Sequence, residues 1–292
     1  MDKRLIIIDS NALLHRAFHA LPPLTNKNGQ PTGAVYGFLL TLFKAIKDLK
    51  ANYIVACFDT PKPTFRHEQF KEYKAHRIKT PDDIISQIPI TKEVLKSFDI
   101  PVFEKEGFEA DDLVATISQI SKKDAEVFIL SGDLDNLQLV DEKIKVYTLG
   151  KGIKDSVVYD ESKVIERFGV KPEQMNDFKA LTGDASDNIP GVAGIGKKTA
   201  AELIKEYGSL KKLYDELATD TAVLKPKVKE ALKNNKENAF LSLQLVETKK
   251  DIDLDFSLEL CKFGNFDQQK IKNVFYELGF NSLIERLPTI IL

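Results

Sequence analysis

Short, nearly uninterrupted apolar runs are the first regular feature of the chain. Four of them stand out: 5–8, 53–58, 126–130 and 144–149. Runs of this length without polar alternation are typical of strands that are buried on both faces of a sheet. A carboxylate follows each of the first three runs, namely Asp9, Asp59 and Asp133. The pattern therefore predicts buried strands that end in acidic residues.

Segments with helical spacing lie between these runs, at 11–20, 37–49 and 113–120. Strands that alternate with helices predict an α/β fold, with a mainly parallel sheet flanked by helices. In such sheets, ligands bind beyond the carboxyl ends of the strands. We therefore expect Asp9, Asp59 and Asp133 to lie along one edge of the sheet.

Gly107–Asp112 places three further carboxylates, Glu109, Asp111 and Asp112, at the start of the third helix. Acidic residues at a helix start also occur for a simpler reason, because they complement the helix dipole. Together with three acids at strand ends, however, they would repel one another strongly unless cations bind. Oxygen ligands suit Mg²⁺ or Mn²⁺ better than zinc. The sequence thus predicts a hard-metal site.

After residue 149 the composition changes to successive helices. Asp160 is expected to cap a helix over 160–168, which Gly169 ends. Further helices are expected at 172–181, 198–207 and 268–278, and a short strand is left open at 254–256. This change divides the chain into an α/β region, 1–168, and a helical region, 169–292.

A glycine-rich stretch, Gly191–Lys198, resembles a phosphate-binding P-loop but lacks its final hydroxyl residue and a preceding buried strand. A helix–hairpin–helix near 183–207 explains it better. Gly194 and Gly196 would let the backbone approach a DNA phosphate, and N–H groups at the next helix start would bind it. A plain connecting turn is the alternative, but Lys197 and Lys198 at its mouth favour the DNA-binding motif.

A basic segment near 61–90 interleaves cations with aromatic residues. The cations are Lys62, Arg66, Lys71, Lys74, Arg77 and Lys79, and the aromatics are Phe65, Phe70 and Tyr73. One interpretation is a solvated helix face, since helical spacing would bring Tyr73 and Arg77 to one side. The other is a nucleic-acid contact that neutralises backbone charge and stacks bases. Thr80–Asp83 is typical of a helix start with proline in the first turn.

Other metal and catalytic motifs are weak. Asp133 and Asp135 could open an EF-hand, but Gln138 stands where that loop needs glycine. His15 and His19 have zinc-like spacing without a third ligand. Cys57 and Cys261 are far apart and belong to no Cys-x-x-Cys motif.

The general composition excludes several classes of protein. The 292 residues carry a net charge of −2, so any polyanion binding must come from segregated charge. No apolar run approaches the roughly 18 residues of a membrane-spanning helix. The start of the chain shows no signal-peptide cleavage pattern, so a cytoplasmic protein is expected.

In combination, seven segments resemble a known family: Ile8–Asn11, Phe58–Asp59, Phe65–Glu68, Tyr73–Arg77, Phe108–Asp112, Gly132–Asp135 and Thr182–Asn188. The chain is similar to the 5′→3′ exonuclease domains of bacterial DNA polymerase I, in the flap endonuclease superfamily. The resemblance covers nearly the whole chain. It implies a PIN-like α/β core and a helix–three-turn–helix DNA-binding region.

The resemblance also implies roles for individual residues. A first metal ion would be held by Asp9, Asp59, Glu109, Asp111 and Asp112. A second would be held by Asp133, Asp135, Asp184 and Asp187. An arch over the site would contribute Tyr73, Lys74 and Arg77, with Arg16 near the flap. The hairpin, with Gly194, Gly196, Lys197, Lys198 and Thr199, would hold duplex backbone through a potassium ion.

The acidic residues predict metal-dependent chemistry, and the resemblance implies a nuclease that cuts 5′ flaps and nicked or gapped duplexes. The ions would be two Mg²⁺ or Mn²⁺, with Lys74 and Arg77 as catalytic cations. The chain is expected to be a monomer, and polymerase domains are its partners if it is a fragment of a polymerase. One alternative is a catalytically silent binder of branched DNA. A small-molecule phosphatase is another, but it leaves the hairpin and the arch unexplained.

Overall fold

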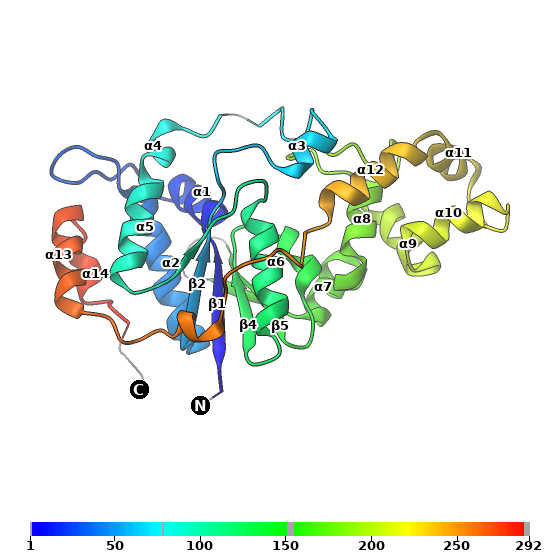
Figure 1. Cartoon of the computed structure of the whole chain (residues 1–292). Coiled ribbons are helices and arrows are strands. Elements are labelled where there is room, and N and C mark those ends of the chain that lie inside the picture. Colours follow the sequence, from blue (N-terminus) through cyan, green and yellow to red (C-terminus); the bar gives the residue numbers. More distant parts are fainter. Residues whose placement is uncertain (1, 78, 151–154, 289–292) are drawn as a thin grey trace.

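A six-stranded sheet forms the centre of the protein (Figure 1). The structure, a computed structural model, describes residues 2–77, 79–150 and 155–288. The strands are β1 (Arg4–Asp9), β2 (Tyr53–Cys57), β3 (Val102–Phe103), β4 (Glu126–Leu130), β5 (Ile144–Leu149) and β6 (Ser156–Tyr159). Their order is β3-β2-β1-β4-β5-β6, and only β6 is antiparallel to its neighbour. The α/β class and the four expected strands are confirmed, whereas β3 and β6 were not predicted.

Alternate strand residues face two separate cores. Ile6, Ile8 and Leu130 face a layer made by α1 (Ser10–Ala20), α2 (Gly33–Leu49) and α5 (Gln87–Ser97). Leu5, Ile7 and Ile129 face the opposite layer, which includes α6 (Ala110–Ser121). Residues 5–8 are completely buried, which explains why their apolar run is unbroken.

The helical half extends away from the sheet, to the right in Figure 1. It comprises α7 (Glu161–Phe168), η2 (Pro172–Gln174), α8 (Met175–Thr182), α9 (Lys197–Tyr207), α10 (Leu210–Ala218), α11 (Pro226–Asn234) and α12 (Lys236–Val246). Asp160 caps α7, and Gly169 ends it with a φ of 74°, as predicted. The expected helix over 172–181 begins as a 3₁₀ turn. Among the described residues, no helix has the length and apolar character needed to cross a bilayer.

The end of the chain returns to the α/β half instead of staying with the helical region. Residues 254–256, where the sequence left a short strand open, form none. The chain then passes η3 (Leu258–Cys261), pairs Lys262 with Tyr53, and forms α13 (Gln268–Leu278) and α14 (Asn281–Ile284). Phe98 of the α/β half lies against Phe266 and Phe275, at ring separations of 5.2 and 6.0 Å.

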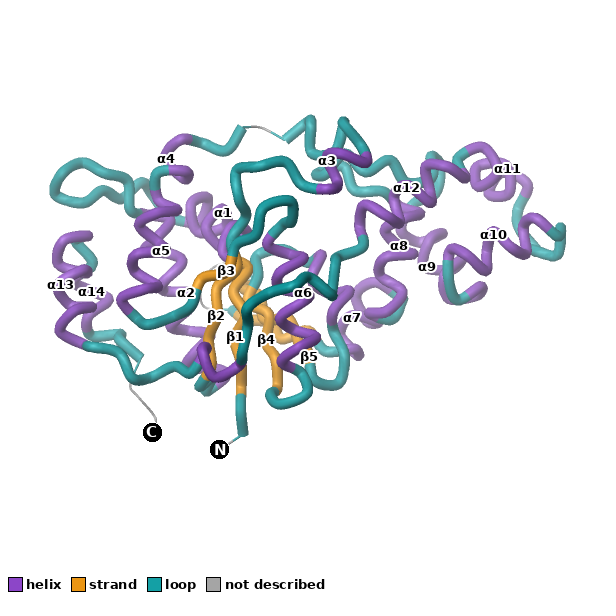
Figure 2. The backbone as a smooth tube through the Cα atoms, viewed as in Figure 1, coloured by secondary structure: helices purple, strands orange, loops and turns teal. Residues whose placement is uncertain are grey.

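The basic segment crosses above the carboxyl ends of the strands (Figure 2). It contains two short helices, α3 (Phe65–Gln69) and α4 (Asp82–Ile85), while Ile78 lies outside the described residues. Residues 71–76 form consecutive turns, so the interpretation of Tyr73–Arg77 as one face of a helix is wrong. The reason is local, because Lys74 has a φ of +56° and a right-handed helix cannot continue through it. Pro81 precedes the first residue of α4 instead of lying within its first turn.

Phe98 provides a test of the returning segment, since it is 2% exposed and contacts aromatic rings from both ends of the chain. Phe98→Ala should lower the free energy of unfolding by about 3–5 kcal/mol, because the cavity removes contacts to all of them. Urea titration measures this change. Tyr276→Ala, at a residue that is 53% exposed, should stay within about 0.5 kcal/mol. A similar cost for both variants would contradict a shared core.

Candidate active site

Asp9 lies at the centre of the acidic edge, at the end of β1 and the start of α1. The register pairs Ile8 with Leu130, which brings Asp9 beside Ser131. The Ser131 hydroxyl donates a 2.6 Å hydrogen bond to Asp9 Oδ2, and the Ala12 amide donates to Oδ1 at 3.4 Å. Asp9 is only 3% exposed, so the parallel sheet fixes one buried carboxylate at its edge.

Asp59 and Asp111 lie near Asp9, the first as a neighbouring charge and the second through a shared partner. Asp59 Oδ1 accepts a 2.7 Å hydrogen bond from the Ala110 amide at the start of α6. The Asn136 side-chain amide donates to Asp111 Oδ1 at 3.1 Å and to Asp9 Oδ2 at 3.4 Å. Strand ends β1 and β2 and the start of α6 therefore converge as the sequence predicts.

Burial makes this group electrostatically unfavourable. Loss of solvent, reinforced by the charge of Asp59, raises the pKa of Asp9 to about 6 even though Ser131 donates to it. Burial also raises the pKa of Asp111 well above its usual range, and the nearby charges of Asp9 and Asp133 add to the effect. A cation that binds between such carboxyl groups favours their charged forms and lowers their pKa values again.

A second group combines Asp133 and Asp135, after β4, with Asp184, after α8. Lys179 of α8 forms ion pairs with Asp135 and, at 3.0 Å, with Asp184. Burial and the charge of Asp133 raise the pKa of Asp135 to about 7. The pKa of Asp184 is instead lowered to about 2, because the charge of Lys179 and donation from Ser186 outweigh its burial.

A third set of contacts connects the arch to Glu109 and Asp187. Lys74 Nζ donates to Glu109 Oε1 at 2.6 Å, and the Tyr73 hydroxyl donates to Glu109 Oε2 at 3.0 Å. Arg77 pairs with Asp187, to which Tyr73 also donates at 3.3 Å. Tyr73 is only 4% exposed, so its ring anchors the arch and is not open for base stacking. Arg77 is about half exposed and faces solvent on one side.

Asp112, expected in the first metal group, has a different environment. It is completely buried, and Arg66 donates to both of its oxygens at 2.8 Å. The amides of Glu109 and Lys249 donate to the same carboxylate. Arg66 is itself 2% exposed and belongs to this ion pair, not to a basic surface. Asp112 and Arg66 therefore form an anchor beneath the site.

The donor set fits divalent metal ions of the hard type. Its members are Asp9, Asp59, Glu109, Asp111, Asp133, Asp135, Asp184 and Asp187, which offer only oxygen. As the side chains stand, no three His, Cys, Asp or Glu residues in the described part of the chain are close enough together to hold a metal ion. Lys74 and Lys179 lie between members of the set instead.

Sequence reasoning missed Ser131, Asn136 and Lys179. Ser131 and Asn136 flank Asp133 and Asp135 in the chain, so a search around the acidic motif could have found them. Lys179 carries no such signal, because one lysine in an amphipathic helix usually lies in solvent. It is recognised only when folding brings α8 against 135–139.

The proposed hairpin lies between α8 and α9. Val192 and Ile195 are buried and anchor it, whereas Gly194, Gly196, Lys197 and Lys198 are exposed and Thr199 is half-buried. Gly194 requires glycine because its φ is +89°. No side chain caps the start of α9, which leaves its first amides available to an anion.

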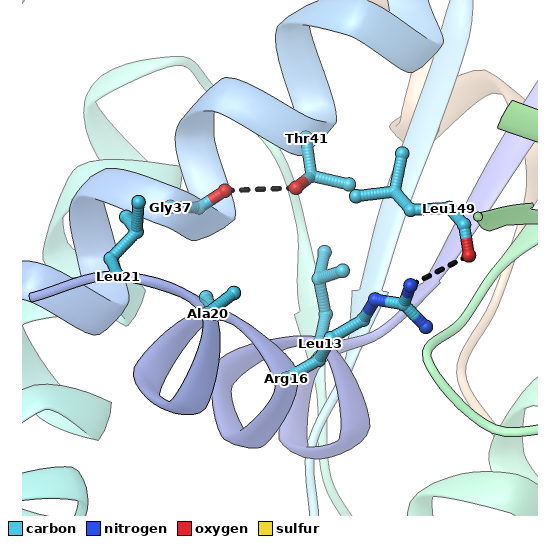
Figure 3. A pocket seen from close by; sticks show the side chains of 8 residues that line it. Leu13, Arg16, Ala20, Leu21, Gly37, Thr41 and Leu149 are labelled. Atoms are coloured by element: carbon cyan, nitrogen blue, oxygen red, sulfur yellow. Dashed lines mark hydrogen bonds between the residues drawn. The ribbon is translucent and has the colours of Figure 1, made fainter. Parts of the chain in front are cut away.

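Arg16 lies beside the turn that precedes Asp133, since a Cβ on Gly132 would be 3.3 Å from the Arg16 Cβ, but its guanidinium has other partners. Its guanidinium donates to the carbonyls of Leu149 and Gly150, both at 2.6 Å, at the wall of a small apolar cavity (Figure 3). Thr41 and Gly37 of α2 form the opposite wall. Arg16 therefore fastens α1 to the end of β5 in this structure.

Known proteins share both halves of this arrangement. Residues 4–169 match the N-terminal resolvase-like domain of 5′-3′ exonucleases, and residues 170–269 match their C-terminal SAM fold. The chain belongs to the 5′-3′ exonuclease family. It is thus an exonuclease, an enzyme that hydrolyses phosphodiesters.

Two relatives in this family differ in length. DNA polymerase I of Bacillus subtilis (strain 168) is 41% identical over 286 residues, which cover 98% of this chain and 32% of the polymerase. The 5′-3′ exonuclease of Aquifex aeolicus (strain VF5) is 38% identical over 289 residues, which cover 99% of this chain and 96% of the relative. The exonuclease chain thus spans about a third of the polymerases but nearly all of the shorter relative.

Solved structures show the same fold. The T5 D15 protein, co-crystallised with metal ions, has a TM-score of 0.70 and 26% identity, covering 84% of this chain and 89% of that chain. The catalytic core of Rad2 in complex with DNA substrate has a TM-score of 0.66 and 21% identity, covering 98% and 91%. A second structure of similar fold, with a TM-score of 0.70 and 27% identity, is that of T5 5′-exonuclease with bound divalent metal ions (zinc).

The raised pKa values of Asp9 and Asp135 predict a pH-dependent stability without metal. Below the usual carboxyl pKa both groups are protonated in the folded and the unfolded protein, so they do not reduce the free energy of unfolding. Above a pH of about 6 for Asp9 and about 7 for Asp135, the folded protein must hold them charged. Stability is therefore lost as the pH rises through these values. The melting temperature in a chelator should fall between pH 5 and pH 8, and saturating Mg²⁺ should reduce the fall.

Asp135→Asn isolates one contribution, because asparagine does not titrate. The pKa of His15 is lowered by burial, so this residue makes stability rise with pH and opposes the effect of Asp135. His15 is present in both proteins, so its effect cancels when their melting temperatures are compared. The variant should show a shallower fall in melting temperature over the same range. Parallel profiles for the two proteins would contradict the raised pKa of Asp135.

Proposed function

We propose that this exonuclease is a structure-specific 5′ nuclease that cuts DNA at 5′ flaps and at nicked or gapped duplexes. The observation that supports it best is the convergence of carboxylates from β1, β2, β4 and α6 on one sheet edge. The arch presents Lys74 and Arg77 to the same edge. A phosphodiester with divalent ions needs such an acidic site beside cations.

Two groups of residues would hold two ions, Mg²⁺ or Mn²⁺. Asp9, Asp59, Glu109 and Asp111 would hold the first, and Asp133, Asp135, Asp184 and Asp187 the second. Asp112 would hold neither directly, because Arg66 and two amides already occupy its oxygens. Bound ions supply an activated water and stabilise charge on the phosphate oxygens.

The chain's own residues would position and neutralise the scissile phosphate. Lys74 Nζ and the exposed side of Arg77 lie at the mouth of the acidic edge and can donate to phosphate oxygens as charge develops. Ser131 and Asn136 keep Asp9 and Asp111 oriented. Arg66 holds the start of α6, and with it Glu109, through Asp112.

The hairpin between α8 and α9 would hold the duplex at a fixed distance from the cut. Gly194 and Gly196 allow close approach of the phosphate backbone, and the first amides of α9 would bind it. The same proposal includes a potassium ion at this hairpin, with further contacts from Lys197, Lys198 and Thr199. It also includes a contact between Arg16 and the flap.

The enzyme would act as a monomer in the cytoplasm, near the nucleoid. It would associate with polymerase domains.

Asp9→Asn should nearly abolish cleavage while flap DNA still binds, because the substitution removes a charge from the first metal group and leaves the arch and hairpin intact. The measurement is product length from a 5′-labelled flap duplex, with and without Mg²⁺. Asp251→Asn, at an exposed acid, is the matched control and should cut like the wild type. A wild-type rate in Asp9→Asn at saturating Mg²⁺ would falsify the metal assignment.

Gly196→Val should weaken binding to every duplex substrate. A Cβ at this position would meet no protein atom within 4 Å and its φ of −90° suits any residue, so the fold should survive. The larger side chain would instead meet the phosphate. Loss of one phosphate contact should reduce the salt slope of log K by about 0.9. If affinity and salt slope both stay at wild-type values, the hairpin is only a connecting turn.

A further inference from the structure

The base of the arch contains a strained turn at its catalytic lysine. The Ala75 amide donates to the Glu72 carbonyl at 3.0 Å, which closes a β-turn with Lys74 as its third residue. The φ of Lys74 is +56°, in the left-handed region that glycine and asparagine favour at this turn position. A lysine there needs support from its surroundings.

The support comes from the loop that carries Asp187. The Lys74 amide donates to the Asp187 carbonyl at 2.9 Å, and the Asn188 side-chain amide donates to the Glu72 carbonyl at 2.7 Å. Asn188 also has a left-handed backbone, with a φ of +57°. Lys74 and Asn188, two residues with left-handed backbones from distant parts of the chain, therefore each donate a hydrogen bond to the turn or loop that contains the other.

The loop is tightly packed and closed by its own hydrogen bonds. Asp184 and Ile189 exchange two backbone hydrogen bonds, of 3.0 and 2.8 Å. A Cβ on Gly183 would lie 2.6 Å from the Ile189 carbonyl oxygen, and one on Gly191 would lie 2.3 Å from the Gly183 nitrogen. The two backbone segments of the loop are therefore too close for a side chain at Gly183 or Gly191, and the base of the arch is hydrogen-bonded to this loop.

We propose that Asn188 is a positioning residue for the nuclease reaction. Its amide holds the Glu72–Ala75 turn in the conformation that directs Lys74 Nζ toward Glu109 and Asp187. Asn188 touches neither Lys74 Nζ nor any carboxylate of the metal groups in the described contacts. This inference rests on the proposed nuclease function, because Asn188 would affect the reaction through the catalytic cation Lys74.

A merely structural role for Asn188 predicts a different result. In that case its loss would destabilise the loop and weaken activity by the same factor whether or not Lys74 is present. If Asn188 acts through Lys74, its loss should matter only while the lysine side chain is there. A double-mutant cycle separates the two cases.

The test combines Asn188→Gly with Lys74→Ala. Glycine accepts a left-handed backbone but lacks the amide, so Asn188→Gly removes the donor and leaves the loop conformation available. Single-turnover cleavage of a 5′-flap duplex at saturating enzyme and Mg²⁺ should slow about tenfold, the scale of one lost hydrogen bond. In the Lys74→Ala background the same change should slow cleavage less than twofold. Flap affinity should be unchanged in all variants.

Two further variants serve as controls. One keeps the size of the Asn188 side chain, and the other removes a side-chain amide elsewhere in the chain. Asn188→Asp keeps the shape but turns an acceptor toward the Glu72 carbonyl, so it should be at least as slow as Asn188→Gly. Asn235→Ala is the matched control, because Asn235 is also half-buried and donates to a backbone carbonyl, that of Ala231, at 2.9 Å. It should cut at the wild-type rate. Equal slowing by Asn188→Gly in both backgrounds would overturn the proposal.

Hydrogen exchange at the Lys74 amide keeps the inference separate from the nuclease function. Asn188→Gly should speed exchange of this amide by about tenfold, because its bond to Asp187 depends on the same turn. If the wild-type protein does not cut flap DNA, the proposed function fails, and exchange still decides whether Asn188 holds the turn. Unchanged exchange would overturn the positioning role by itself.

Discussion

Repulsion among carboxylates at one sheet edge is the constraint on which the rest of this structure depends. A parallel sheet brings its carboxyl ends to the same side, and here three of those ends lead into acidic residues. Cations from the chain offset part of this charge: Arg66, Lys74, Arg77 and Lys179. Each of these cations lies outside the sheet. Their ion pairs with the acids therefore link the arch and the helical half to the edge of the sheet.

Arg66 shows how one ion pair joins three parts of the chain. Besides Asp112, its guanidinium donates to the carbonyls of Leu245 and Glu247 at 2.8 and 2.9 Å. The segment 245–249 begins at the end of α12 and leads out of the helical half to Lys249, whose amide donates to Asp112. Gln138 holds the same segment, since its side chain donates to the Val246 carbonyl. A buried pair of this kind is costly to break, because removing one partner leaves an uncompensated charge.

The sequence predicted the features that follow from local pattern. Buried strands produce unbroken apolar runs, and a parallel sheet then requires Asp9, Asp59 and Asp133 to meet. It did not separate Asp112 from its neighbours Glu109 and Asp111, because the three look alike until Arg66 is folded against one of them. The left-handed turn at Lys74 was equally hidden, since lysine gives no signal for positive φ and its support comes from Asn188, more than a hundred residues away.

The same loop joins the second acidic group to the hairpin that we propose as the duplex contact. Asp184 and Asp187 lie at one end of it, and the buried hairpin residues Val192 and Ile195 follow within a few positions. The Val192 amide donates to the Leu181 carbonyl at 2.9 Å, so the hairpin is fixed to the helix that also carries Lys179. A duplex held at the hairpin is therefore held at a set distance from the second acidic group. Because Asn188 connects this loop to the turn at Lys74, one short stretch of backbone links Asp184, Asp187 and Lys74 to the proposed duplex-binding hairpin.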